Sequence, residues 1–316
     1  MGSPFSKLVD APYRSHPATA LVDLVPSVLR GVSEHDADAL RATLGIDTVR
    51  DLALNPAAAG ARAILAAAGE PGFDPGPPPA WAALFARAPL AHYRSHPSGR
   101  FRLGFGPVFY RGRLDGTARV LLIGQDPAAN ELVAHRTLVG DSGQRVQGLL
   151  RKLGITRSYV TVNTFLYGVF GQYDTVLRGV SAEPVVAAFR TEVLDRLVEE
   201  NPIEVVVAIG RAAGEVVDEW APPTGVRRES ITHPGSPDDA AVTTNWNGAL
   251  ARLAPALEPD PGVDADATPY GAGFEPDDHE PIPRADLPFG VPEFLGVGSH
   301  AERDGNDVLR VSTQAR

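Results

Sequence analysis

The chain has 316 residues, a formal net charge of -10, 43% hydrophobic residues and no cysteine. Its length accommodates one sizeable core with appendages, and the lack of cysteine excludes disulfide bridges and thiolate metal or iron–sulfur sites. The longest apolar runs are far too short to cross a bilayer, and the first residues lack the apolar stretch of a secretory signal. We therefore expect a cytoplasmic protein.

The negative charge is concentrated in the last segment of the chain. Residues 1–90 carry 7 basic and 9 acidic side chains, residues 91–255 carry 18 and 17, and residues 256–316 carry 4 and 13. The middle segment is therefore free to present a local basic face, although the whole chain is acidic. The net charge neither excludes nor supports a nucleic-acid partner.

Residues 1–90 have the apolar spacing of helices. One helix is expected to end at Gly45 and the next to begin at Thr48, whose hydroxyl caps it with Asp51 three residues later. The hairpin over 27–56 resembles a helix-hairpin-helix, a motif that often grips a DNA phosphate, although a plain helical hairpin is the commoner interpretation. The Pro- and Gly-rich stretch that follows, PGFDPGPPPAW, predicts a linker.

Residues 91–256 alternate between short apolar strands and amphipathic helices. Strands are predicted at 118–124, 159–165, 204–210 and 227–233. Helices are predicted at 142–155, 184–201, 211–220 and 243–254. This alternation predicts an α/β fold, a three-layer α/β/α sandwich with a four-stranded, mainly parallel sheet. Ligands bind at the carboxyl ends of the strands in such sheets.

The segment 257–316 is rich in Pro, Gly and acidic residues. Such a composition buries too little apolar surface to order itself alone, so we expect an acidic tail that is partly disordered. The run EPDDHE at 275–280 contains metal-ligand residue types, but solvated charge is the better interpretation in this context.

Three polar residues lie at the carboxyl ends of predicted strands: Asp126 just after the first, Asn163 at the end of the second and His233 at the end of the fourth. Each has an ordinary explanation, because an Asp or Asn after a strand commonly shapes a turn and a His before Pro is commonly a surface residue. Their shared position at one edge of the sheet favours a functional site. Pro127 and Gly124 would fix the direction of the Asp126 side chain.

The same residues lie in motifs that resemble those of the uracil-DNA glycosylase superfamily. The chain reads GQDP at 124–127, VTVNTF around Asn163 and HPGSP at 233–237. The segment HRTLVGDSGQRVQGLLRKLGI at 135–155 is similar to the superfamily's RPFVG-type segment, and AIGRAA at 208–213 to its ALGRTA-type segment. The resemblance covers roughly residues 100–255.

The resemblance implies a DNA glycosylase of base excision repair that flips a nucleotide out of the DNA and hydrolyses its N-glycosidic bond. It implies the following roles. Asp126 and His233 would be catalytic; Gln125, Leu138 and Asn163 would bind the base; Pro234, Gly235 and Ser236 would contact the DNA backbone. No cofactor and no metal is implied, since water is the other reactant, and a prokaryotic protein of this kind would be nucleoid-associated.

Two departures from the superfamily pattern concern the base pocket. Ala128 and Ala129 follow GQDP, where the best-known branch has Tyr and His, and Leu138 replaces the usual stacking aromatic residue. The iron–sulfur cysteines of the branches with an RPFVG-like segment are lacking, as is the Arg-Arg-Ile-His loop of the covalently trapping branch. A bulky modified base, such as one in phage DNA, is therefore an alternative substrate, which would imply a defence role.

Other function classes have weaker support. The GDSG run at 140–143 echoes serine hydrolases, but Asp141 or Ser142 as a helix cap is the better interpretation. Dinucleotide-binding and P-loop glycine patterns are lacking. A non-catalytic, glycosylase-like module that binds nucleic acid stays open. The cations Arg136, Arg145, Arg151, Lys152 and Arg157 could contact phosphates, although solvated helix charges are commoner.

Overall fold

The computed structural model describes residues 8–67, 72–292, 294–298, 301–304 and 308–312. Within them the chain forms two compact units. The smaller unit comprises residues up to 75 together with 288–292, and the larger comprises 76–287 and the described residues after 293. None of the described helices is both long and apolar enough to span a membrane.

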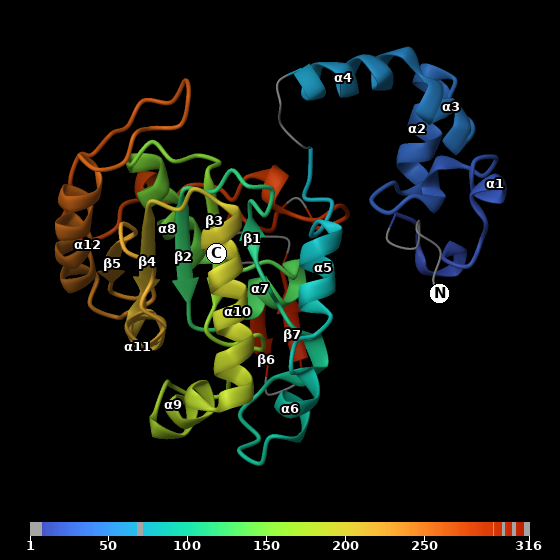
Figure 1. Ribbon diagram of the computed structural model, residues 1–316. Helices are drawn as coiled ribbons and strands as arrows, with labels where there is room; N and C mark the ends of the chain where they lie inside the picture. The colour runs from blue at the N-terminus through green and yellow to red at the C-terminus, as the bar shows by residue number, and fades with distance from the viewer. Residues whose placement is uncertain (1–7, 68–71, 293, 299–300, 305–307, 313–316) are drawn as a thin grey trace. The chain divides into compact units, whose positions relative to one another are not determined.

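The larger unit is built on a five-stranded sheet (Figure 1). Its strands are β1 (Arg111–Gly112), β2 (Val120–Gly124), β3 (Tyr159–Asn163), β4 (Val205–Ile209) and β5 (Arg227–Ile231). Their order is β1-β3-β2-β4-β5, and all neighbours are parallel except β1, which runs antiparallel to β3. The mainly parallel α/β fold is thus as predicted, with one strand more. Two residues carry no alternation of side chains, so β1 had no signal in the sequence.

Helices cover both faces of this sheet. The helices of the larger unit are α5 (Pro79–Phe85), α6 (Leu90–Ser95), α7 (Ala129–Ala134), α8 (Asp141–Lys152), α9 (Thr175–Ala182), α10 (Pro184–Glu200), α11 (Gly210–Trp220) and α12 (Asp239–Leu253). Side chains of α8 and α12 pack with Val120 and Leu122 on one face. Side chains of α5, α10 and α11 pack with Leu121 and Ile123 on the other face. Because β2 is buried on both faces, it is apolar throughout rather than alternating.

The smaller unit contains α1 (Ala18–Leu21), α2 (Glu34–Leu44), α3 (Val49–Leu54) and α4 (Pro56–Ala67). Helix α2 ends at Gly45, whose φ of 64° is left-handed, and α3 begins after Thr48. The Thr48 hydroxyl accepts a hydrogen bond from the Asp51 amide, and the Asp51 carboxylate accepts one from the Thr48 amide. Helix α5 packs in the larger unit, so the change of unit falls near 75 rather than at the expected 90.

The structure differs from the loose tail expected over 257–316. Leu257 and Tyr270 are buried in the core beside α8 and α12, and Ile282 and Leu287 pack against Ala134 and Val139. Between 257 and 287 the segment is irregular apart from two short 3-10 turns, so its few apolar residues gave no periodic signal. They are nevertheless enough to attach it, because the core already supplies the opposing surface.

Two buried carboxylates reinforce this attachment. Asp260 accepts hydrogen bonds from the backbone amides of Thr156, Arg157 and Ser158 at 2.8, 2.9 and 3.2 Å. Burial alone would raise the pKa of Asp260, but the Ser158 hydroxyl and these amides outweigh it and lower the pKa. Asp286 is fully buried and pairs with the equally buried Arg111 at 3.0 Å. The tail is therefore part of the folded domain as far as 287.

Candidate active site

The three strand-end motifs meet at one edge of the sheet. Gly124 at the end of β2 lies in register with Asn163 at the end of β3. A Cβ added to Gly124 would lie 2.4 Å from Oδ1 of Asn163, so glycine is required for this close approach. On the other side of β2, Ile209 at the end of β4 is in register with Ile231, which precedes His233 by two residues. The carboxyl ends of these parallel strands therefore bring the predicted residues to a common edge.

The Asp126 carboxylate is fixed by two donors. Its Oδ2 accepts a hydrogen bond from the backbone amide of Val169 at 2.8 Å, and its Oδ1 accepts one from Nε2 of Gln125 at 2.9 Å. Asp126 and Gln125 are both half-buried. The Gln125 amide nitrogen, expected to bind a base, is thus directed at Asp126 in this structure. A carboxylate held by two donors points in one direction instead of sampling several rotamers.

Glu131 on α7 organises the segment that carries Leu138. Its Oε1 accepts hydrogen bonds from the amides of Val139 and Gly140 at 2.8 and 3.1 Å, and its Oε2 is buried without a hydrogen-bond partner among the described residues. Leu138 has a φ of 54°, a left-handed conformation that costs a non-glycine residue free energy. Glu131 is therefore a positioning residue for this segment. No pattern in the sequence indicates this role, because a contact across eight residues has no characteristic spacing.

The start of α8 approaches the same segment closely. A Cβ on Gly143 would lie 1.8 Å from the backbone oxygen of Leu138, so only glycine fits there. The Leu138 side chain is 8% exposed and packs with the core beside α8, including Val146. Gly140 is the N-cap of α8 and no side chain caps the helix, so the cap expected from Asp141 or Ser142 is not formed. Close backbone packing therefore fixes the start of α8 against the Leu138 segment.

His233 lies in a turn that fixes its tautomer. The backbone amide of Gly235 donates a hydrogen bond to Nδ1 of His233 at 3.0 Å, so in the neutral ring the proton must be on Nε2. A Cβ on Gly210 would lie 3.2 Å from Cβ of His233, which shows how closely the end of β4 approaches the residue. His233 retains an exposed surface, but desolvation of the ring by the surrounding protein lowers its pKa. The ring is therefore neutral near pH 7 and presents one N–H donor.

Arg145 on α8 holds the His233 turn in place. Its Nη1 donates hydrogen bonds to the backbone oxygen of Pro234 at 2.6 Å and to Oδ1 of Asp239 at 3.1 Å. Its Nε lies 3.2 Å from Nε2 of His279, and its guanidinium lies 4.4 Å from the ring centroid of Phe274. Arg145 therefore joins the turn after β5 and the start of α12 to the tail. Of the five cations suggested as phosphate contacts, this one has an internal role.

The other four cations also have contacts within the larger unit. Arg136 lies 4.9 Å from the ring centroid of Tyr110, and Arg151 pairs with Glu280 at 3.5 Å. Lys152 pairs with Asp278 at 3.5 Å, and Arg157 donates to the backbone oxygen of Pro261 at 3.3 Å. Three of these four contacts are with the tail. The acidic tail thus contacts three of the cations that the middle segment was free to present to a partner.

A cavity of about 520 Å³ opens between the motifs. Its walls come from the GQDP loop with α7, from the start of α8, from the turn after β5 and from the tail at Ala301. The residues that line it include Ala128, Ala129, Asp141, Ser142, Pro234, Gly235 and Ser236. The three residues expected to contact the DNA backbone therefore face one open cavity. His233 and Ser236 also line a neighbouring hollow with Arg211 and Asn245.

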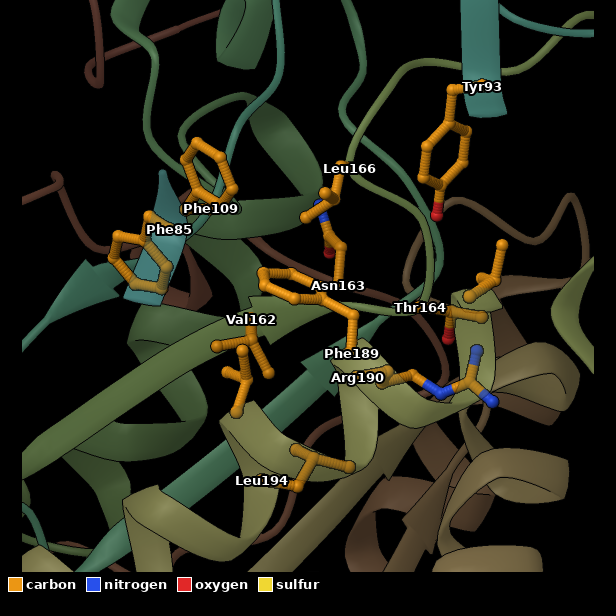
Figure 2. Close-up of a pocket in the computed structure, with 12 residues that line it drawn as sticks. Phe85, Tyr93, Phe109, Val162, Asn163, Thr164, Leu166, Phe189, Arg190 and Leu194 are labelled. Atoms are coloured by element: carbon orange, nitrogen blue, oxygen red, sulfur yellow. The ribbon is translucent and has the colours of Figure 1, made fainter. Parts of the chain in front are cut away.

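A second, narrow cavity lies beside Asn163 (Figure 2). The rings of Phe85, Phe109 and Phe189 lie to one side of it and the phenol of Tyr93 to the other. Its volume of about 20 Å³ admits a water molecule but not a nucleobase. Asn163 is 8% exposed, and its amide makes no hydrogen bond within the described part of the chain. Its donor and acceptor are therefore uncommitted in a wall that is otherwise mostly apolar.

Comparison with known proteins adds one finding. Residues 111–249 match the family model of the Uracil DNA glycosylase superfamily. This range contains all eight residues proposed for the site from the sequence, and it contains β1 to β5. No curated protein matches the chain.

Proposed function

Residues 111–249 belong to the uracil-DNA glycosylase superfamily, and on that premise we propose that the chain hydrolyses the N-glycosidic bond of a flipped-out uracil or modified base. Membership implies a glycosylase-type function that acts on DNA. The single observation that carries the finer proposal is the doubly held carboxylate of Asp126, at the same sheet edge as the fixed tautomer of His233. The product would be an abasic site, which is the entry point of base excision.

Asp126 would orient the attacking water and stabilise the positive charge that develops on the sugar. As the glycosidic bond breaks, its electron pair leaves with the base and the deoxyribose gains oxocarbenium character. A fixed anion stabilises that positive charge, orients the water that attacks C1′ and takes up its proton. The hydrogen bonds from Val169 and Gln125 support this role, because the carboxylate is aimed before the substrate arrives.

His233 and Asn163 would act on the departing base. Negative charge builds on a base oxygen as the bond breaks, and the Nε2–H of a neutral His233 can donate a hydrogen bond to it. The uncommitted amide of Asn163 would pair with the edge of a base once the entering nucleotide widens the narrow cavity beside it, and its donor and acceptor would distinguish uracil from cytosine. Pro234, Gly235 and Ser236 would hold the phosphates beside the flipped nucleotide, since they line the open cavity.

A second candidate substrate is a base with a bulky 5-substituent, as in modified phage DNA. The observation in its favour is that Ala128 and Ala129 line a cavity of about 520 Å³ at the GQDP loop. A larger side chain at either position would reduce this space. Activity confined to uracil over a panel of 5-substituted bases would exclude this candidate.

The test is base release from labelled oligonucleotides, single-stranded and duplex, that contain uracil, mismatched thymine, hypoxanthine or hydroxymethylated or glucosylated cytosine. We expect the wild type to leave cleavable abasic sites at one or more of these bases. Asp126→Asn and His233→Ala should each slow release about a hundredfold to a thousandfold, because each removes a preorganised group. The exposed Asp115, in the loop before β2, provides a matched control, and Asp115→Asn should keep full activity.

DNA binding distinguishes the catalytic proposal from the alternative that the chain is a non-catalytic module that binds nucleic acid. Anisotropy titrations with the same oligonucleotides should show that Asp126→Asn still binds DNA. If the wild type binds DNA but releases no base from any member of the panel, the chain is a nucleic-acid-binding module and the catalytic proposal is wrong.

A further inference from the structure

Two histidines and one glutamate meet outside the candidate active site. His92 lies on α6 and His96 directly follows this helix, four residues later, so both rings project from the same side of the turn. Glu183 lies between α9 and α10. Its Oε2 is 2.5 Å from Nε2 of His92, and its Oε1 is 2.9 Å from Nε2 of His96. The three ligand-type atoms lie within 4.8 Å of one another.

The surroundings resemble those of a metal ligand set rather than of a mobile surface pair. The side chain of His96 is 8% exposed, and those of His92 and Glu183 are about one-third exposed. Nδ1 of His96 lies 2.7 Å from the hydroxyl of Ser98, which can donate or accept. A histidine ligand commonly donates its second ring N–H to such a group, which fixes the ring orientation. The partial exposure of the other two side chains leaves room for a water ligand.

We propose that His92, His96 and Glu183 bind a divalent transition-metal ion, with zinc the expected ion. Two imidazole nitrogens and one carboxylate oxygen form a ligand set that zinc accepts, with water as the fourth ligand. The pairs of Nε2 and carboxylate oxygen atoms are slightly too close to enclose an ion as they stand. Ligand bonds of about 2.0–2.1 Å in a tetrahedron place ligand atoms about 3.3 Å apart, so small side-chain rotations suffice.

Binding the ion requires a change of tautomer at His96 that its surroundings permit. The backbone amide of Ser98 lies 3.2 Å from Nδ1 and donates to it, which places the ring proton on Nε2, where it is shared with Glu183. With Nε2 bound to the ion, the proton belongs on Nδ1, and the Ser98 hydroxyl would become its acceptor. The backbone amide of Ser98 would lose its acceptor in this exchange, so it would have to turn away from Nδ1 when the ion binds.

The ion would join segments far apart in the sequence. Glu183 is separated from the two histidines by 91 and 87 residues. The ring of His96 contacts that of Phe101, whose backbone forms a bridge with Val169, the residue whose amide holds Asp126. The bound ion would therefore fasten α6 to the α9–α10 junction and brace the segment that leads to Asp126. Its role is structural, since none of its ligands lies among the strand-end motifs.

The test uses the full chain, stripped with a chelator and titrated with Zn²⁺ by calorimetry and with Co²⁺ by visible absorption. We expect one strong site per chain and the absorption bands of four-coordinate Co²⁺. His96→Ala and Glu183→Gln should each abolish that site, and Ser98→Ala should weaken it at least about tenfold. Saturating Zn²⁺ should raise the unfolding temperature of the wild type by a few degrees but not that of His96→Ala.

His35, an exposed histidine of the smaller unit, provides the matched control. His35→Ala should bind Zn²⁺ and Co²⁺ as the wild type does. Circular dichroism of His96→Ala and Glu183→Gln checks that both remain folded. A wild-type chain that takes up no Zn²⁺ in a saturable way, or one whose site survives both ligand substitutions, would show that these side chains form a hydrogen-bonded cluster only.

Discussion

At the scale of single residues, hydrogen bonds decide what each polar side chain can do. Gly235 determines which nitrogen of His233 carries the proton, and Glu131 holds the backbone amide of Val139, next to the left-handed Leu138. Both contacts involve backbone amides in turns, and residue types alone do not specify where such amides point. His233 and Leu138 could therefore be predicted from the sequence, but the Gly235 amide and the Glu131 carboxylate that orient them could not.

The lowered pKa of His233 gives a prediction for the pH dependence of base release. Because the neutral ring is the proposed donor state, the rate should be level around pH 7 and decline only below the ordinary histidine pKa of about 6.5. The free energy of unfolding should also fall as the pH falls, because the unfolded chain takes up the proton on His233 before the folded chain does. The measurement is the single-turnover rate of base release from about pH 5 to about pH 8, a range that includes the ordinary histidine pKa. A rate that already halves above pH 7 would contradict a neutral donor.

At the scale of helices and strands, the long apolar elements were predictable and the short ones were not. The predicted strands and the helices α8, α10, α11 and α12 agree with the structure because a buried sheet and amphipathic helices leave a periodic pattern. Helix α7 has six residues and β1 has two, which is too few for a period to appear. The site depends on both kinds of element, since α7 carries Glu131.

Arg145 on α8 positions the His233 turn between β5 and α12, so removing its side chain should affect base release. Arg145→Ala should slow base release about tenfold or more, with a smaller change in DNA affinity, because the His233 turn loses its hydrogen bond at Pro234 and its link to Asp239 of α12. Arg145→Lys should recover part of the rate. Single-turnover rates and anisotropy titrations separate the two effects.

Arg151 on the same helix provides the comparison. It is 63% exposed and reaches Glu280 at 3.5 Å, so Arg151→Ala should leave the rate within about twofold of the wild type. Equal losses in the two variants would mean that charge on α8, rather than the position of the His233 turn, governs the reaction.

At the scale of the whole molecule, residues 257–287 of the acidic tail are a structural part of the larger unit. Asp286 reaches the fully buried Arg111, and Tyr159 donates its hydroxyl to the same carboxylate. Composition predicted a disordered segment because it averages over residues, whereas attachment depends on a few side chains such as Tyr270 and Asp286. Glu280 and Asp278 of the tail pair with Arg151 and Lys152 of α8, so these charges face the protein itself.

The buried ion pair of Arg111 and Asp286 gives a prediction for stability. Asp286→Ala should lower the free energy of unfolding by about 3–5 kcal/mol, because it leaves the Arg111 charge buried without its partner. Asp277, an exposed residue of the same tail, is the control, and Asp277→Ala should change the free energy by less than about 0.5 kcal/mol. Urea unfolding followed by circular dichroism measures both. Equal midpoints for the two variants would show that the tail contributes little to stability.

The contact between Arg111 and Asp286 also has a consequence for protein synthesis. The two residues are 175 positions apart, and both belong in the interior. At about 5–20 residues per second, a ribosome needs roughly 9–35 s to travel from one to the other. Once β5 has been made, the nascent domain has all five strands of its sheet but carries an unneutralised guanidinium in its core until Asp286 is added. We therefore expect the unfinished polypeptide to depend on chaperones until residues 257–287 emerge, and a gene truncated near 256 to yield aggregates.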